Sequence, residues 1–445
     1  MDYRQSLVER MVNLLEPAGN QIFNMTVEEA TERVGSGDPE AVREIDGQFA
    51  LVHKRGTVIR MARSIGRPMR FFLAKKAEGP LLIVAERMDE IRAFLEQEGI
   101  AEQFHPTYTR MVPAHYIMEL SLVGCPDPNP SCTRFLDSNR DQLPSDLDRI
   151  GEEYIGALSQ EIDRWLDHIP NDAPIGVMFS GGIDSGAVLL CTYDRLLKRG
   201  ETPQRLKAFT LTVGDSGEDA GQAGEFLKAV DLDMLLETVS VQPEDLSLDD
   251  TIRVIEDYKP LDVQSATMGL ALCRGIRQRY SDWVYLLDGD GGDENLRDYP
   301  IEENPELTIR SVLSNPFFYH EGWGVDAVKH SLTYSGGQSR GHVRTSAPAA
   351  VEGFKGFSPF ATPNVIDVAE GIPFVELTDW DHTKLYALKG EVTRRGVEAV
   401  TGITMPIFEK RRFQRGAVND RGFEEIFPEN EQEYRDVFAK VFLSK

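Results

Sequence analysis

A chain of 445 residues, 41% of them hydrophobic, has the composition of a globular protein with two or three domains, because one hydrophobic core rarely serves more than about 300 residues. Its formal net charge of −25 argues against binding nucleic acid or an anionic membrane, so any anion site has to be local. No apolar run could span a bilayer, and the first residues lack the apolar core of a signal peptide. We therefore expect a cytoplasmic protein.

The N-terminal third predicts a small domain that mixes helices and strands. Residues 1 to about 45 are polar with helical spacing, and Thr26 is placed to cap a helix. The following stretch to about residue 95 has short apolar runs separated by Gly and Pro, which is typical of an antiparallel sheet. Residues 121–144, which contain CPDPNPSC, are interpreted as an exposed linker.

From about residue 145 helices and strands alternate. Apolar residues at helical spacing over 147–168 lead into the strand Ile175 to Phe179. Further strands are expected at 206–213, 235–241 and 283–290, with helices near 183–199, 219–231 and 262–280. This alternation predicts a doubly wound parallel sheet with ligands at the carboxyl ends of its strands. The last third has mainly helical patterns.

The sequence SGGIDSGAVLL, from Ser180 to Leu190, joins the first of these strands to a helix. Its glycines let backbone amides approach a ligand, the hydroxyls of Ser180 and Ser185 add donors, and the helix N-terminus favours negative charge. Phosphate is the expected ligand, although a serine-glycine turn also occurs in unrelated α/β proteins. The spacing fits neither the P-loop nor the dinucleotide motif.

A second glycine-rich turn, Gly289 to Glu294 (GDGGDE), follows the strand at 283–290 and is dense in carboxylates. Carboxylates beside a triphosphate would repel it unless a cation intervened, so this turn predicts Mg²⁺. A solvated turn or a Ca²⁺ loop are the alternatives, but the EF-hand spacing is absent.

Near the C-terminus, MPIFEKRRFQRGA concentrates positive charge in an acidic chain, and without other information it would be read as a solvated basic face. The four cysteines are too few for a disulfide framework. Cys125 and Cys132 lack CxxC spacing, whereas Cys191 and Cys273 lie in apolar helical patterns typical of a core. No reactive cysteine pair is evident.

SGGxDS followed by a GxDE-type turn resembles the asparagine synthetase-like N-type ATP pyrophosphatases, which carry SGGxDS and SGEGxDE. Three segments of the N-terminal third, Gly47 to Leu51, Ala62 to Pro68 and Ala85 to Ile91, resemble the second half of that family's glutaminase domain. The resemblance implies a doubly wound α/β ATP-pyrophosphatase domain of the adenine nucleotide alpha hydrolase-like kind over 145–445. It also implies an α+β, Ntn-type glutaminase-like remnant over 1–120.

The resemblance also assigns roles to individual residues. It implies that Asp184 and Asp293 hold Mg²⁺ and that Asp290 lies on the nucleophile side. It also implies that Lys410 stabilises the charge that develops during the reaction, with Lys389 as a second basic residue. Glu256 and Asp262 match an acidic stretch near the substrate. The residues implied for ATP and its pyrophosphate are Ser180, Gly181, Gly182, Asp184, Ser185, Leu211, Val213 and Gly289, of which Leu211 to Val213 should line the adenine pocket.

Departures from the family pattern gather on the substrate side. Gly186 stands where the family has a second serine, NLRDYP follows the second turn in place of FGGY, and GFKGFSPFAT (Gly353 to Thr362) lacks the arginine and final aspartate of GxExRxPFLD. The glutaminase nucleophile, a cysteine following the initiator methionine, is absent because Asp2 follows Met1. The N-terminal domain is therefore interpreted as non-catalytic.

The expected function is ATP-dependent amide formation, in which a carboxylate is adenylated with release of pyrophosphate and the acyl group passes to ammonia or an amine. The partners expected are ATP, Mg²⁺ and small molecules or a peptide, without nucleic acid or membrane, and a homodimer is compatible with this. The alternatives are a specialised cyclase of secondary metabolism (β-lactam synthetase- or lasso-cyclase-like), a tRNA sulfur-transfer enzyme, and a catalytically inactive regulator. A carboxylate at Asp290, where β-lactam synthetases have a tyrosine, favours the asparagine-synthetase side.

Overall fold

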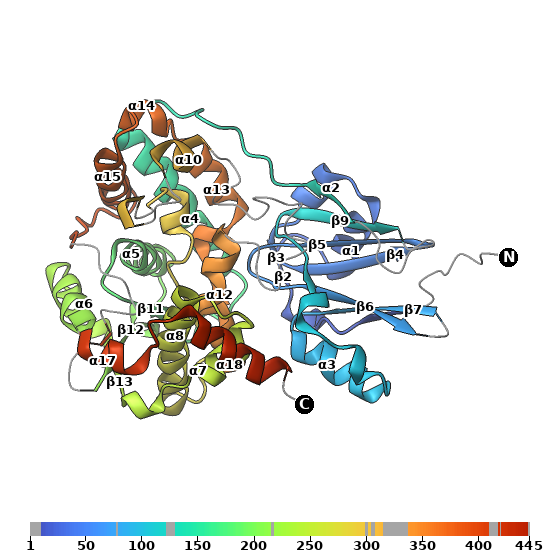
Figure 1. Ribbon diagram of the computed structural model, residues 1–445. Coiled ribbons are helices and arrows are strands. Elements are labelled where there is room, and N and C mark those ends of the chain that lie inside the picture. The colour runs from blue at the N-terminus through green and yellow to red at the C-terminus, as the bar shows by residue number, and fades with distance from the viewer. Residues whose placement is uncertain are drawn as a thin grey trace. The chain divides into compact units, whose positions relative to one another are not determined.

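The computed structural model describes residues 10–76, 79–121, 130–214, 218–298, 301–303, 308–314, 337–408, 417–418 and 420–443 (Figure 1). The chain forms two compact units, the first made mainly of residues up to Asp137 and the second mainly of residues Ser138 to Val441. Among the residues described, no helix combines the length and the apolar character needed to cross a membrane.

Up to Asp137, the described residues of the first unit form two four-stranded sheets, one two-stranded pair and three α-helices. The sheets have the strand orders β1-β7-β6-β8 and β10-β9-β5-β4, and β2 pairs with β3. The strands are β1 Arg10–Asn13, β2 Gln21–Ile22, β3 Gly47–Gln48, β4 Ala50–Arg55, β5 Val58–Arg63, β6 Arg70–Lys76, β7 Gly79–Ala85, β8 Arg110–Met111, β9 Tyr116–Ser121 and β10 Ser131–Arg134. The helices are α1 Val27–Ser36, α2 Pro39–Arg43 and α3 Met88–Gln97.

This unit has four layers, because alternate side chains of its strands point into different hydrophobic cores. Leu82 and Val84 of β7 enter the core between the two sheets, whereas Leu81 and Ile83 enter a second core beneath α3. On the other sheet, α1 packs against β4 and β5. The order of the layers is therefore α1, sheet, sheet, α3.

Two predictions for this part of the chain can be compared directly with the structure. Thr26 caps α1 as expected, since its hydroxyl accepts from the Glu29 amide at 3.2 Å while the Glu29 carboxylate accepts from the Thr26 amide at 2.9 Å. Within the stretch 121–144, interpreted as a linker, residues Ser131 to Arg134 form β10, which pairs with β9 as an edge strand. β10 has only four residues, and Cys132 lies on its half-buried face. This alternation is too short to be recognised as a strand in the sequence.

The second unit is built on one parallel sheet with the strand order β13-β12-β11-β14-β15, as the βα alternation predicted. Its strands are β11 Ile175–Met178, β12 Leu206–Val213, β13 Leu236–Val241, β14 Tyr285–Leu287 and β15 Lys355–Phe357. Its helices are α4 Leu147–Leu166, α5 Ile183–Lys198, α6 Glu218–Ala229, α7 Leu248–Ile255, α8 Pro260–Arg279, α9 Gly292–Asn295, α10 Ile309–Ser314, α12 Gly337–Val351, α13 Pro363–Glu370, α14 Phe374–Thr378, α15 His382–Thr401, α17 Asp420–Ile426 and α18 Glu431–Leu443. The sequence did not predict β15, which has three residues.

The cysteines of this unit are core residues, as expected. Cys191 and Cys273 are fully buried, and burial raises the pKa of the Cys191 thiol to about 12 and that of Cys273 further. A thiol with so high a pKa is a poor nucleophile near neutral pH. Neither cysteine can therefore serve in sulfur transfer while the unit is folded.

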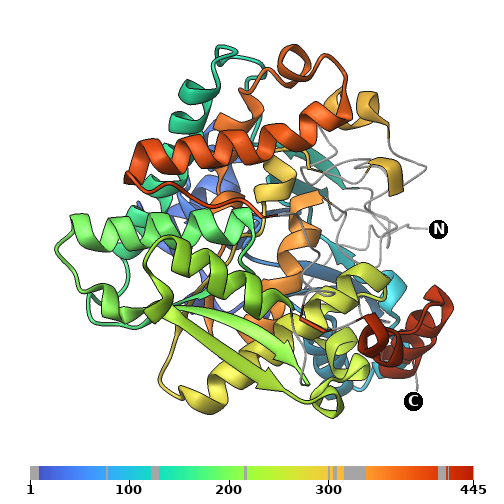
Figure 2. The ribbon, with the colours of Figure 1, turned by 90° about the vertical axis from the view of Figure 1, so that its left-hand side faces the viewer.

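Helix α15 lies beside α4 and α5 (Figure 2). It approaches α4 so closely that the two backbones touch at a pair of glycines. A Cβ added to Gly151 would lie 2.7 Å from the Gly396 amide nitrogen and 2.7 Å from the Val392 carbonyl oxygen. Because backbone atoms cannot move aside as side chains do, this crossing requires glycine.

Gly396→Ala is accordingly expected to destabilise the second unit by about 1–3 kcal/mol, the usual cost of overpacking a tight contact. The measurement is the free energy of unfolding in urea, followed by circular dichroism. Gly156→Ala in α4 is the matched control, because nothing lies within 4 Å of the added methyl group. It should stabilise the helix by about 0.5–1 kcal/mol. Equal effects of both changes would contradict the close crossing.

Candidate functional site

The order of the parallel strands places the two glycine-rich turns side by side. From the central strand β11 the chain moves to β12 and β13 on one side, and later to β14 and β15 on the other. The crevice between β11 and β14, where the direction of winding reverses, is the usual ligand site of such sheets. The turn after β11 carries SGGIDS and the turn after β14 carries DGDGGDE, so both meet at this crevice.

The first turn is compact and its donors are clustered. Gly181 has a φ of +74°, and a Cβ there would lie 2.8 Å from the Ala223 amide nitrogen, so no other residue fits. The Ser180 and Ser185 hydroxyl oxygens are 3.3 Å apart, and the Gly182 amide donates to the Ser180 hydroxyl at 3.3 Å. Helix α5 begins directly after this turn, so its N-terminal amides and both hydroxyls can receive one anion.

The second turn packs against the first through its own glycines. A Cβ at Gly289 would lie 2.8 Å from the Ser185 amide nitrogen. A Cβ at Gly292 would lie 2.5 Å from the carboxyl carbon of Asp184. Any side chain at either position would push the turns apart, so these glycines set the spacing of the crevice.

A buried lysine joins the carboxylates of the two turns. The ammonium of Lys389, on α15, donates to Asp184 Oδ2 at 2.6 Å and to Asp293 Oδ1, and lies 3.5 Å from Asp298 Oδ2. Its side chain is only 4% exposed. Burial by itself would lower the pKa of Lys389, but the three carboxylates outweigh it and raise the pKa well above its ordinary value. The side chain is therefore a permanent cation.

This arrangement fits the predicted metal ligands. Asp184 and Asp293 direct one oxygen each at a single point that a cation occupies, and hard carboxylate oxygens are the ligands Mg²⁺ prefers. The part of the chain that the structure describes contains no group of three or more His, Cys, Asp or Glu arranged to hold a metal. A metal at Asp184 and Asp293 would thus take its remaining ligands from phosphate and water, as Mg²⁺ does at nucleotide sites.

The same face of α15 also holds the chain that follows the second turn. The Tyr386 hydroxyl donates to Glu302 Oε2 at 2.6 Å and accepts from the Ile301 amide at 2.8 Å, and His382 Nε2 lies 2.7 Å from Glu302 Oε1. His382, Tyr386 and Lys389 follow one another at helical spacing, so one helix face contacts both parts of the loop.

Two carboxyl groups of the second turn meet at one hydroxyl. Thr345, on α12, contacts Asp290 Oδ2 and lies 3.4 Å from Asp288 Oδ2. Burial raises the pKa of Asp288 to about 6, and burial together with the neighbouring Asp288 raises the pKa of Asp290 well above its ordinary value. These two groups titrate as a pair that holds a proton near neutral pH.

Helix α12 also supplies an arginine to this side of the crevice. Arg344 Nε donates to Asp262 Oδ1 at 2.8 Å, and Asp262 is 1% exposed. Burial would lower the pKa of Arg344, but Asp262 and Glu294 outweigh it and raise the pKa. Burial, with repulsion from Asp293, raises the pKa of Glu294 itself to about 7.

The remaining predicted residues are placed as follows. The side chains of Leu211 and Val213 are buried in the hydrophobic core with Met268, so a nucleotide can reach only the backbone of these two residues. Glu256 is 3% exposed and ends α7 in a left-handed conformation, with a φ of +53°. Lys410 lies outside the described residues.

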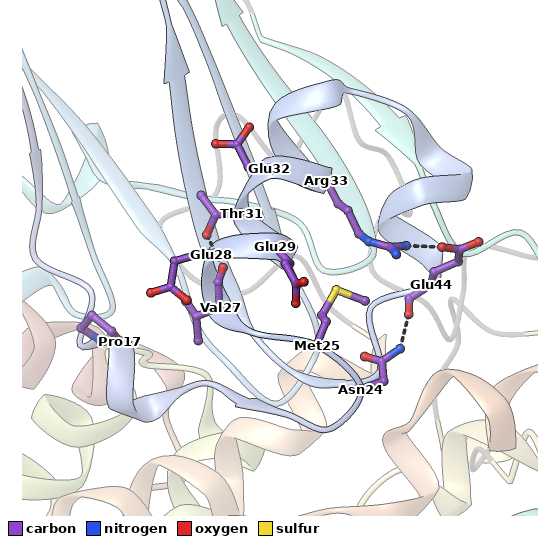
Figure 3. A pocket seen from close by; sticks show the side chains of 10 residues that line it. All are labelled: Pro17, Asn24, Met25, Val27, Glu28, Glu29, Thr31, Glu32, Arg33 and Glu44. Carbon is purple, nitrogen blue, oxygen red and sulfur yellow. Dashed lines mark hydrogen bonds and ion pairs between the residues drawn. The ribbon is translucent and has the colours of Figure 1, made fainter.

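A pocket of about 1040 Å³ lies in the first unit around the start of α1 (Figure 3). Several of its acidic side chains already have structural partners. Glu29 belongs to the cap of α1, and Glu44 pairs with Arg33 and accepts from Asn24 through its carbonyl oxygen. The pocket contains none of the residues predicted for ATP, so we assign no chemistry to it.

The second unit thus combines a parallel sheet with two glycine-rich turns at its reversal point, whose aspartates Asp184 and Asp293 share one buried lysine. The family model described as Asparagine synthase matches residues 163–346, which include both turns and Arg344. No curated protein matches the chain. The family match supports an asparagine synthetase-like family, and hence an ATP-dependent ligase in general.

Sequence reasoning missed Asp288, Asp298, Arg344, Thr345 and Tyr386. Asp288 and Asp298 lie on either side of the predicted turn. Only their contacts in the folded chain, with Thr345 and Lys389, show that they belong to the site. Arg344 and Thr345 lie on a helix for which the sequence analysis proposed no role, and their side chains join the site through tertiary packing.

Asp288→Asn is expected to change how stability depends on pH. An acid whose pKa is raised on folding stabilises the fold below its unfolded pKa, and this contribution is lost as pH rises through the folded value of about 6. Wild-type stability should thus fall between about pH 4 and 6 through this residue, and the variant should gain on the order of 2 kcal/mol relative to wild type from pH 4 to pH 8. Urea unfolding at several pH values measures this. The exposed Asp282→Asn should show no such gain.

Proposed function

We propose that the second unit is an ATP-dependent ligase that adenylates a carboxylate, releases pyrophosphate and passes the acyl group to ammonia or an amine. The products are an amide and AMP. The observation that supports this best is the meeting of an amide- and hydroxyl-lined turn with two carboxylates on one cation, at the reversal point of the sheet. Anion and metal sites side by side suit a polyphosphate.

In this proposal the first turn binds the pyrophosphate part of ATP. The amides at the start of α5 and the hydroxyls of Ser180 and Ser185 hold its oxygens, while Gly181 and Gly182 let the backbone approach. Asp184 and Asp293 would hold Mg²⁺, which neutralises phosphate charge when bound. The closeness of Gly289 to Ser185 then keeps metal ligands and anion donors at a fixed distance.

Asp288, Asp290 and Thr345 form the proposed acceptor side. The Asp288 and Asp290 pair can take a proton from an attacking amine, and Thr345 orients both carboxyl groups. Asp262, whose carboxylate accepts from Arg344 Nε, is proposed to lie near the substrate. Lys410 is proposed to stabilise the charge that develops as the intermediate forms and collapses, because a fixed cation acts electrostatically.

The test is pyrophosphate release from Mg-ATP by the purified protein, measured across a panel of carboxylates that includes aspartate and peptides, with ammonia or mixed amines. Release should depend on one carboxylate and fall at least 100-fold in Asp184→Asn and Asp293→Asn, which lose metal ligands. Asp282→Asn, on the exposed approach to β14, should act like wild type. If release with every carboxylate equals that without any, the proposal is wrong.

The panel also separates the two forms of this activity. Dependence on aspartate and ammonia would identify an ammonia-using asparagine synthetase. Dependence on another carboxylate or on a peptide would identify a specialised amide synthetase or cyclase. The burial of Cys191 and Cys273 disfavours sulfur transfer to tRNA.

We further propose that the first unit is a glutaminase-like domain without glutaminase activity. Among its described residues the one cysteine, Cys132, is half-buried within strand β10, so it lacks the free α-amino group that acts as the base of an N-terminal nucleophile. Within this proposal the protein works in the cytoplasm on free ammonia or an amine.

Glutamine should therefore neither release ammonia nor support amide formation, even at concentrations at which ammonia does. The measurement is glutamate formation from glutamine, with and without Mg-ATP and the active carboxylate. Glutamate formed at the rate of amide formation would refute the loss of glutaminase chemistry, while leaving the ligase proposal intact.

A further inference from the structure

Lys389 occupies the point at which the proposed metal ligands meet. Its Nζ contacts Asp293 Oδ1 and lies 2.6 Å from Asp184 Oδ2. A Mg²⁺ ion held by the same two oxygens would need the position between them that the ammonium occupies. An ammonium and a divalent cation cannot share that position, since both sterics and charge forbid it.

Three carboxylates face the single ammonium of Lys389. They are those of Asp184, Asp293 and Asp298, so the group carries a net charge of about −2 when all four are ionised. A divalent cation would neutralise that excess. The single ammonium therefore leaves carboxylate charge that a divalent cation can also bind.

Asp298 offers the lysine another partner. Its Oδ2 lies 3.5 Å from Nζ, the longest of the three ion pairs, and its side chain is only 11% exposed. An ammonium that left the other two carboxylates could move toward Asp298 without entering water. The flexible four-carbon stem of lysine permits such a shift.

We propose, resting on the function proposed above, that Lys389 is a positioning residue that exchanges with the metal. It holds Asp184 and Asp293 together until a divalent cation takes them, and it then keeps Asp298. Lys389 and the metal thus compete for the same two ligands. The competition makes metal binding weak until a triphosphate supplies further oxygens, so metal and nucleotide bind together.

The test is the affinity of the full chain for Mn²⁺ without nucleotide, measured from the electron paramagnetic resonance signal of free Mn²⁺. Lys389→Met removes the ammonium and keeps most of the side-chain volume, so it should bind Mn²⁺ at least tenfold more tightly than wild type. Lys389→Arg keeps the charge and should show no gain. Lys384→Met, on an exposed position of the same helix, should match wild type.

Unchanged or weaker Mn²⁺ binding by Lys389→Met would overturn the proposal, because Lys389 would then arrange the ligands for the metal. If this variant does not fold alone, circular dichroism in millimolar Mg²⁺ decides the matter. Folding that depends on Mg²⁺ would support the exchange, since the metal replaces the missing cation. A variant that stays unfolded in Mg²⁺ would refute it.

This readout needs no substrate, so it fails separately from the proposed function. Pyrophosphate release by wild type without a gain of Mn²⁺ affinity in Lys389→Met would refute the exchange alone. A gain of affinity in a protein that releases no pyrophosphate with any carboxylate would refute the ligase proposal and leave the exchange in place.

Discussion

The arrangement of the second unit depends on one buried ammonium among three carboxylates. Lys389 lies 205 residues from Asp184 and 96 residues from Asp293 in sequence, yet it bonds both. Taking a lysine out of water costs several kcal/mol, and only close, well-oriented carboxylates repay that cost. The cluster therefore ties three elements together at once: the turn after β11, the turn after β14 and α15. The glycine crossing of α4 and α15 brings the lysine within reach, because it lets α15 lie close against the rest of the unit.

The glycines of the second turn have a physical reason that the sequence analysis did not foresee. The resemblance placed Gly289 among the residues for ATP and its pyrophosphate and assigned no role to Gly292. In the structure, Gly289 and Gly292 instead meet the backbone and carboxyl group of the first turn. They allow two turns to pack without a side chain between them. A spacing rule can identify such a turn, but it cannot say which neighbour requires the glycine.

The sequence was sufficient for the parallel sheet and for its two glycine-rich turns, because buried strands and glycine-rich turns leave strong local patterns. It was insufficient for β10 and β15, which are short strands that owe their conformation to pairing. It also could not place Arg344 and Thr345. Their helix shows no clear apolar periodicity and contains Pro348, and its contribution to the site arises only from packing. Lys389 was recognised by resemblance, but its three partners could not be read from spacing.

Asp288 and Asp290, whose carboxyl groups both contact Thr345, can together act as a base. A hydroxyl has one hydrogen and can donate it to only one of Asp288 and Asp290, so its contact with both is best satisfied when one carboxyl group is protonated. The remaining proton site has a pKa close to the value of about 6 at Asp288, which suits a general base near neutral pH. A single exposed carboxylate would titrate near pH 4 and would be a weaker base. In the proposed reaction, Asp288 and Asp290 share one proton before the amine attacks. The pair then has one site left, which can take the proton of the attacking amine.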